Sequence, residues 1–115
     1  MTAIRLLPRS PYDLWRWAEE LFSTRDYLGA ATTLESLLVH PEVDERDLAQ
    51  VRELLVRAYY HSARLGKAAE AARAALAADP GNTYLLLLLG RSLERAGHAE
   101  DALPYLRMAD ATGVA

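Results

Sequence analysis

The sequence predicts an all-helical fold, a stack of three antiparallel helix hairpins. Apolar residues recur at intervals of three and four positions over long segments, which is the spacing of one buried helix face. β-Branched residues are scattered, and no stretch alternates apolar with polar residues as a strand does. A similar pair of helical segments recurs about every 34 residues, which is typical of stacked repeats.

Six helical segments are expected between residues that break helices. They lie at about residues 12–24, 27–40, 44–65, 67–78, 83–96 and 100–111. The breakers are Pro8 with Pro11, the Arg25-Asp26 corner, Pro41, Gly66, the turn at residues 79–82, Gly97 and Gly113. Because the connections are short, we expect hairpins at about residues 11–41, 44–80 and 83–112, with residues 1–10 as an extension and 113–115 as a tail.

Particular residues refine these segments. One buried face of the first two segments should comprise Leu14, Trp17, Ala18 and Leu21, followed by Ala30, Leu34 and Leu37. Asp44 can cap the long third segment by accepting from its free backbone N–H groups. Pro104 falls early in the last segment, so a late start or a kink is expected there. The fourth segment is crowded with alanine and has Leu76 as its large apolar anchor, so its rotation stays open.

Composition limits the class of protein. The chain of 115 residues fits one domain, and 51% hydrophobic with 25% charged residues is typical of a folded protein. A formal net charge of −3, with both signs interspersed, argues against nucleic acid or an anionic membrane as a partner. The absence of cysteine excludes disulfides and thiolate chemistry. Apolar residues near the N-terminus (Ile4, Leu6, Leu7) and the leucine run at 85–89 are too short for a secretory or membrane-spanning segment, which predicts a cytoplasmic protein.

The third repeat carries the most detailed pattern. Its Leu86, Leu89, Gly90, Leu93, Gly97, Ala102, Leu106 and Ala109 have the spacing of the tetratricopeptide repeat, so the segment resembles this family. The small residues Gly90 and Ala102 allow close helix approach, and Gly97 suits a left-handed turn. The first two repeats resemble the family through Leu14, Trp17, Ala18, Leu21, Tyr27, Ala30, Leu34 and Pro41, then Leu55, Ala58, Tyr59, Asp79 and Pro80. In the middle repeat Gly66 comes late, which leaves the register between its two helices open.

The resemblance implies a right-handed superhelical stack, an α-solenoid, that binds a peptide or protein in a concave groove without catalysis. In this family the first helix of each hairpin lines the groove. The residues so placed are Tyr12, Trp15, Arg16, Glu19 and Phe22, then Gln50, Glu53, Arg57, Tyr60 and His61, and finally Tyr84, Leu87, Arg91, Glu94 and Arg95. Among them Arg57, Arg91 and Arg95 are expected to seat an anionic peptide, since guanidinium groups bind carboxylates in a planar fork.

Other roles for these side chains stay open. The arginines can instead pair with Glu53 and Glu94 along their own helices, where each pair contributes a few tenths of a kcal/mol, on the order of 0.3. Trp15 and Phe22 can be core residues of an end hairpin. Family members that grip chaperone C-termini use a Lys and Asn pattern, whereas the single lysine here, Lys67, lies at a turn, so a chaperone co-factor is not expected.

The sequence also bears on three other functions: self-association, RNA binding, and catalysis or metal binding. A self-associating module, a homodimer, is the alternative, because the last hairpin is expected to expose residues from Leu85, Leu89, Leu103, Tyr105 and Met108. RNA binding is disfavoured by the net charge and the single lysine. No catalytic, cofactor or metal site is expected, since there is no glycine-rich phosphate loop and His40, His61 and His98 form no ligand pair.

Overall fold

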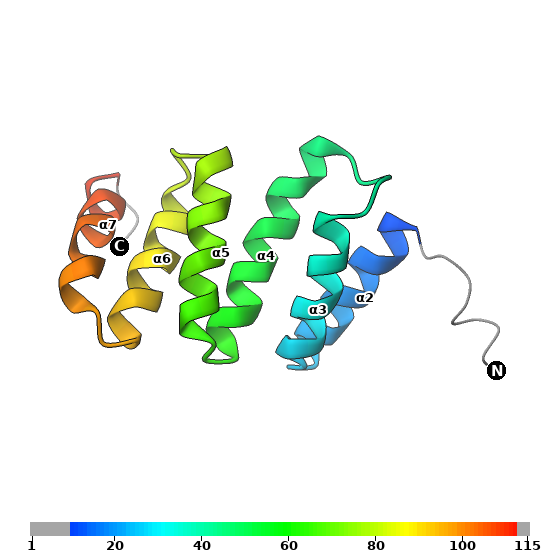
Figure 1. Ribbon diagram of the computed structural model, residues 1–115, viewed down its shortest axis with the longest axis horizontal. Coiled ribbons are helices and arrows are strands. Elements are labelled where there is room, and N and C mark those ends of the chain that lie inside the picture. The colour runs from blue at the N-terminus through cyan, green and yellow to red at the C-terminus, as the bar shows by residue number, and fades with distance from the viewer. Residues whose placement is uncertain (1–9, 113–115) are drawn as a thin grey trace.

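The computed structural model describes residues 10–112, which form six α-helices and one short 3-10 helix without a strand (Figure 1). The elements, labelled as in Figure 1, are α2 (Pro11–Ser23), α3 (Tyr27–Leu38), η1 (Glu45–Asp47), α4 (Leu48–His61), α5 (Leu65–Ala78), α6 (Thr83–Arg95) and α7 (Ala99–Ala111). The all-helical prediction is therefore confirmed for this part of the chain. The expected breakers Pro8 and Gly113, and the apolar residues of the extension, lie outside the described residues.

Each helix packs against the next one along the chain, and α4 also contacts α6. Figure 1 shows the helices side by side in a row, and the extents of 51 × 26 × 19 Å reflect this arrangement. Buried side chains form two clusters, one from α2 to α4 together with Ala68 of α5, and one mainly from α5 to α7. Helix α4 belongs to both, because Leu55 faces the first cluster and Val56 the second. This helix is therefore the packing link between the two ends of the molecule.

The same turn ends the first helix of every hairpin. A residue with positive φ stands there in each case: Arg25 (68°), Ala63 (60°) and Gly97 (90°). Its N–H donates to the carbonyl three residues back, and the next N–H donates to the carbonyl five residues back, at 2.8 to 2.9 Å. This Schellman arrangement satisfies carbonyls that the helix end would leave free. The predicted turns at Arg25 and Gly97 are confirmed.

The prediction that Gly66 breaks the middle hairpin is wrong. Helix α4 ends at His61 and α5 already begins at Leu65, so Gly66 is helical, while Ala63 takes the left-handed position. The sequence was misleading because glycine favours that conformation most and alanine pays a steric penalty of about 1–2 kcal/mol in it. With this turn the middle hairpin has the same register as the other two.

The common register places a small residue at each hairpin crossing. Ala30, Ala68 and Ala102 each follow the left-handed residue by the same interval, and all three are fully or almost fully buried. Gly90 provides a second close approach, because a Cβ atom built there would lie 2.5 Å from Leu106 Cδ2 and 3.3 Å from the Leu106 backbone nitrogen. The expected close approach at Gly90 and Ala102 is confirmed.

Burial corrects several expectations for the end hairpins. Trp17 was predicted to be buried, but it is 45% exposed. Leu55 and Leu89 hold the matching positions in α4 and α6, and both are buried against the preceding hairpin. No hairpin precedes α2 within residues 10–112, so Trp17 has nothing to pack against there. Leu85 and Leu89 are buried, not exposed, because they face α5; Leu103 and Met108 of α7 are exposed as expected.

The structure also shows where α7 begins, which turn Asp44 caps and which face of α5 is buried. Helix α7 begins at Ala99, so the late start expected from Pro104 is wrong; the proline lies inside the helix on its exposed side. Asp44 accepts from the Arg46 N–H at 3.3 Å and thus caps η1, the turn that leads into α4. Helix α5 buries Ala68, Ala69, Ala72 and Ala75.

A polar contact joins the first two hairpins. The Tyr59 hydroxyl of α4 donates a hydrogen bond to Glu35 Oε2 of α3. Burial, together with this hydrogen bond and the nearby Glu35 charge, raises the pKa of Tyr59 to about 12. Tyr59 therefore stays protonated and keeps its donor at neutral pH.

The turn register predicts that two opposite substitutions, alanine to glycine at one position and glycine to alanine three residues later, both stabilise the protein. Ala63→Gly should stabilise the protein by about 1 kcal/mol, because glycine removes the left-handed strain. Gly66→Ala should stabilise it by up to about 1 kcal/mol, since the residue is helical and an added Cβ meets nothing within 4 Å. Urea unfolding measures both values. If Gly66 were the turn residue, both substitutions would destabilise the protein.

The close approach at Gly90 predicts a cost for a larger side chain. Gly90→Val should destabilise the protein by about 1–3 kcal/mol, because the new atoms overlap Leu106 and force α6 and α7 apart. Gly81→Val is the matched control, since a Cβ there meets nothing within 4 Å. Equal unfolding free energies for the two variants would contradict the tight crossing.

Candidate functional site

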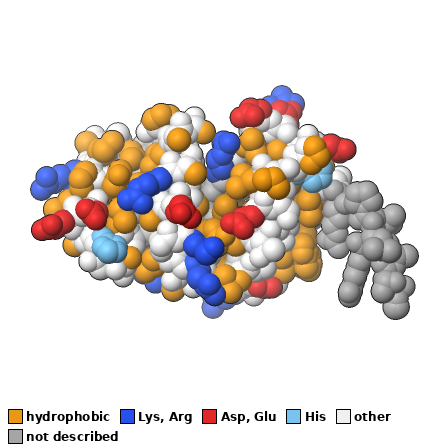
Figure 2. Space-filling model, in the orientation of Figure 1, with side chains coloured by type: hydrophobic (Ala, Val, Ile, Leu, Met, Phe, Trp, Pro, Cys, Tyr) orange, Lys and Arg blue, Asp and Glu red, His pale blue; other side chains and the backbone are white. Residues whose placement is uncertain are grey.

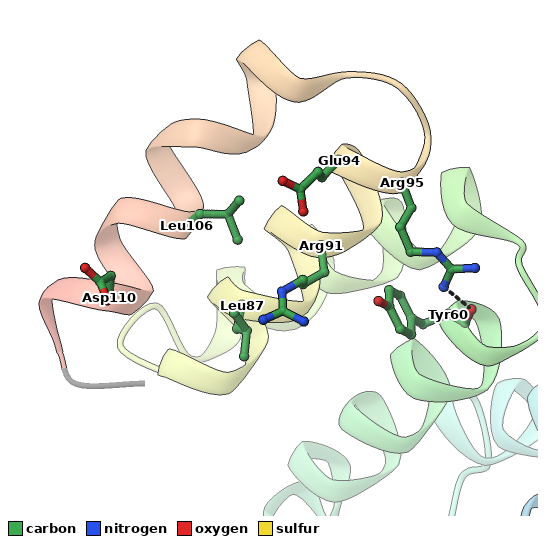
Figure 3. A pocket seen from close by; sticks show the side chains of 7 residues that line it. All are labelled: Tyr60, Leu87, Arg91, Glu94, Arg95, Leu106 and Asp110. Carbon is green, nitrogen blue, oxygen red and sulfur yellow. Dashed lines mark hydrogen bonds between the residues drawn. The ribbon is translucent and has the colours of Figure 1, made fainter. Parts of the chain in front are cut away.

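Two hollows lie along the first helices of the hairpins and contain most of the predicted groove residues. The first, of about 320 Å³ between α2 and α4, is lined by Trp15, Glu19, Phe22, Gln50, Glu53, Leu54 and Arg57. The second, of about 560 Å³ between α4, α6 and α7, is lined by Tyr60, Leu87, Arg91, Glu94, Arg95, Leu106 and Asp110 (Figure 3). Side chains from all three hairpins thus contribute to these two hollows.

Four predicted groove residues do not line either hollow: Tyr12, Arg16, His61 and Tyr84. Tyr12 and Arg16 contact each other, with Arg16 Nη1 donating to the Tyr12 hydroxyl at 2.9 Å. Tyr12 instead lines a separate hollow of about 460 Å³ near the start of α2, together with Trp15 and Gln50. Tyr84 is exposed on the first turn of α6.

Three aromatic rings surround His61, and two of them, Phe22 and Tyr60, also line the first and the second hollow. The His61 imidazole stacks on Tyr27, with ring centroids 5.3 Å apart and an interplanar angle of 28°. Phe22 and Tyr60 each meet His61 edge-on, at 5.7 Å between centroids. Phe22 and Trp15 are half-buried and pack against the first core cluster, so they serve the core and also line the hollow.

Two arginines lie over rings that contact His61. The Arg57 guanidinium carbon lies 4.9 Å from the centroid of Phe22, and that of Arg95 lies 4.7 Å from the centroid of Tyr60. Arg95 also donates from Nη1 to the Tyr60 carbonyl oxygen at 3.4 Å (Figure 3). Such stacking holds a guanidinium in place while leaving its edge available to a ligand. We call Arg57, His61 and Arg95, with the rings of Phe22, Tyr27 and Tyr60, the cationic cradle.

The arginines of the cradle have no carboxylate partner within residues 10–112. The alternative that they pair with Glu53 and Glu94 is not observed; the ion pair in this part of the chain joins Arg46 to Asp44 at 3.1 Å. Arg57 Nε is buried and has no hydrogen-bond partner. In Figure 3 the Arg91 guanidinium lies between Leu87 and Tyr60, whereas Glu94 projects from another side of α6. Carboxylates line the same hollows, but none of them lies within ion-pair distance of these arginines in the described residues.

This charge acts on the histidine. Burial lowers the pKa of His61, and the positive charges of Arg57 and Arg95 lower it further. No carboxylate is among the groups that act on it. His61 is consequently neutral at pH 7 in the free protein.

Sequence reasoning missed several contributors. Tyr27 stacks on His61 from the start of α3, and Leu106 and Asp110 reach the second hollow from α7. These residues lie on second helices, which the family pattern does not place in the groove. The stacking of Tyr27 on His61 becomes visible only in the structure, where the start of α3 lies beside the end of α4.

Other kinds of site have no support in the described part of the chain. Residues 10–112 contain no group of three or more side chains suited to hold a metal ion. None of the helices there combines the length and apolar character needed to cross a bilayer. Figure 2 shows acidic and basic side chains scattered among hydrophobic ones on the visible face, not gathered into a broad area of one sign.

The cradle predicts an abnormal titration of His61. Its pKa, followed by NMR of the imidazole protons, should lie below 6.5, and Arg95→Gln should raise it because one positive charge is removed. Arg107→Gln is the control, since this exposed arginine of α7 is not among the groups that act on His61. A His61 pKa that does not respond to Arg95→Gln would contradict the arrangement.

Comparison with known proteins adds no assignment. No family model matches the sequence, and no curated protein matches it. The functional interpretation therefore rests on the residues and geometry of the chain itself.

Proposed function

We propose that this chain is a non-catalytic interaction module that binds a peptide or protein partner along α2, α4 and α6. In this proposal the hairpins form a right-handed superhelical stack of the tetratricopeptide-like kind, and the two hollows are parts of one concave groove. The protein acts in the cytoplasm, without cofactor, nucleic acid or membrane. Its role is to hold a partner as an adaptor or scaffold.

The observation that carries the proposal is a set of arginines that lie beside aromatic rings and form no ion pair within residues 10–112. Arginine and aromatic residues dominate the binding energy of protein interfaces, because they combine large contact area with directed hydrogen bonds. Arg57, Arg91 and Arg95 are placed beside such rings and hollows, without an internal ion pair in residues 10–112. A partner that supplies apolar and polar contacts fits this surface.

A capture experiment with matched charge variants tests the function. The wild type, Arg57→Glu plus Arg91→Glu, and Arg73→Glu plus Arg107→Glu are used as baits in native extract. The second pair makes the same change in net charge on exposed positions of α5 and α7. We expect a partner bound by the wild type and the control pair and lost from the groove pair, as read by quantitative mass spectrometry. Identical partners from all three baits would contradict binding through the groove.

A second candidate function is self-association through the ends of the row. Trp17 and Leu28 are exposed on the first hairpin, and Leu103 and Met108 on the last, each between 44% and 50%. Because each is already about half buried, complete burial would contribute about half of the ~1.5–3 kcal/mol that a fully exposed side chain gains. Light scattering distinguishes this candidate: a dimer that Leu103→Glu converts to monomer would favour it, whereas a monomeric wild type would exclude it.

A further inference from the structure

The cationic cradle has the properties of an anion-binding site. Two guanidinium groups lie close enough to one imidazole to act on its charge, and each lies over an aromatic ring and not beside a paired carboxylate. The groups facing His61 are known from each packed element: Phe22 from α2, Tyr27 from α3, Arg57 and Tyr60 from α4, and Arg95 from α6. None of them carries a negative charge at neutral pH.

Resting on the function proposed above, we propose that the cradle binds a carboxylate of an acidic peptide between Arg57 and Arg95, and that His61 takes up a proton when it binds. The carboxylate can come from an Asp or Glu side chain or from the end of a chain, because the chemistry is the same. On binding, a proton moves from solvent to the imidazole, so that three cations face the anion.

The surroundings of the cradle favour a peptide over a nucleic acid. Glu19 and Glu53 line the first hollow, and Glu94 and Asp110 line the second, so a polyphosphate would meet negative charge on both sides. Apolar side chains stand beside the same carboxylates: Leu54 in the first hollow, Leu87 and Leu106 in the second. A peptide with one or two carboxylates at its centre and apolar residues on either side matches this order of charge and apolar surface.

The proton uptake follows from linkage. The arginines disfavour the imidazolium in the free protein, and a bound carboxylate removes that disadvantage, so the His61 pKa is higher in the complex than in the free protein. Affinity therefore increases as the pH falls from above the pKa of the complex to below that of the free protein. Below the His61 pKa of the free protein the affinity no longer changes with pH. It falls again near about pH 4, where the peptide carboxylates themselves become protonated.

Fluorescence polarisation with defined octapeptides tests the inference. The probe has two glutamates at its centre and leucines on either side, and it is acetylated and amidated. A second peptide carries glutamine at every glutamate position, and a third is the glutamine peptide with a free C-terminal carboxylate. The glutamate probe should bind at least about tenfold more tightly than the fully blocked glutamine peptide, which is a difference of about 1.4 kcal/mol. Binding of the third peptide would identify the chain end as the source of the carboxylate.

Variants locate the site. Arg57→Gln and Arg95→Gln should each weaken binding of the glutamate probe severalfold, whereas Arg73→Gln on α5 should leave it unchanged. Arg95 is exposed, so its variant should fold even if loss of the half-buried Arg57 disturbs packing; circular dichroism checks both. His61→Asn should retain binding at pH 8 and lose the increase in affinity between pH 8 and pH 5.5.

Several results would overturn the inference. These are equal binding of the three peptides, equal loss in Arg73→Gln and Arg95→Gln, a pH dependence that survives in His61→Asn, or stronger binding of an oligouridine than of the glutamate probe. The two proposals fail separately. If a captured partner depends on Arg57 and Arg91 while no carboxylate peptide binds, the groove function stands and the acidic ligand is wrong.

Discussion

The left-handed residue that ends each first helix is the constraint on which the rest of the structure depends. It fixes where the second helix begins, and one residue of shift would rotate that helix by about 100°. With Arg25, Ala63 and Gly97 in this conformation, Ala30, Ala68 and Ala102 all point into their hairpins and the helices cross closely. The same turn brings Tyr27 back against His61, so the site depends on it as well as the core.

Stacking then decides the environment of residues that are equivalent in sequence. Trp17, Leu55 and Leu89 occupy the same place in α2, α4 and α6, yet the first is half exposed and the other two are buried. The difference lies in the neighbour and not in the residue, because a repeat buries part of its surface only against the next repeat. Helix α4 has neighbours on both sides and joins the two core clusters, which makes it the most constrained place on which to carry a site.

The helices and most of the packing could be predicted from the sequence. The prediction failed where a residue adopts a backbone conformation that its type does not prefer. Periodicity identified Ala30, Leu34 and Leu37 as buried, and repeat spacing identified Gly90 and Ala102 as crossing points. It failed at Gly66, because an alanine three residues earlier accepts a conformation that glycine favours. For the candidate site, the repeat pattern correctly placed Arg57, His61 and Arg95 on the first helices of their hairpins. It could not show that rings, not glutamates, hold the arginines, since side-chain pairing depends on the angles between helices.

The absence of ion pairs around the cradle, within the described residues, matters because of what an internal pair would do to a ligand. A guanidinium already paired with Glu53 or Glu94 would have to lose that carboxylate before accepting another, and the exchange would yield little net binding energy. A ring leaves the guanidinium edge free while restricting its motion, so less conformational entropy is lost on binding. Burial of Arg57 Nε adds to this effect, because a charged group partly removed from water gains more from an arriving anion than a fully hydrated one does. For the carboxylate proposed above, this arrangement would lower the cost of binding, while the same arginines keep His61 uncharged in the free protein.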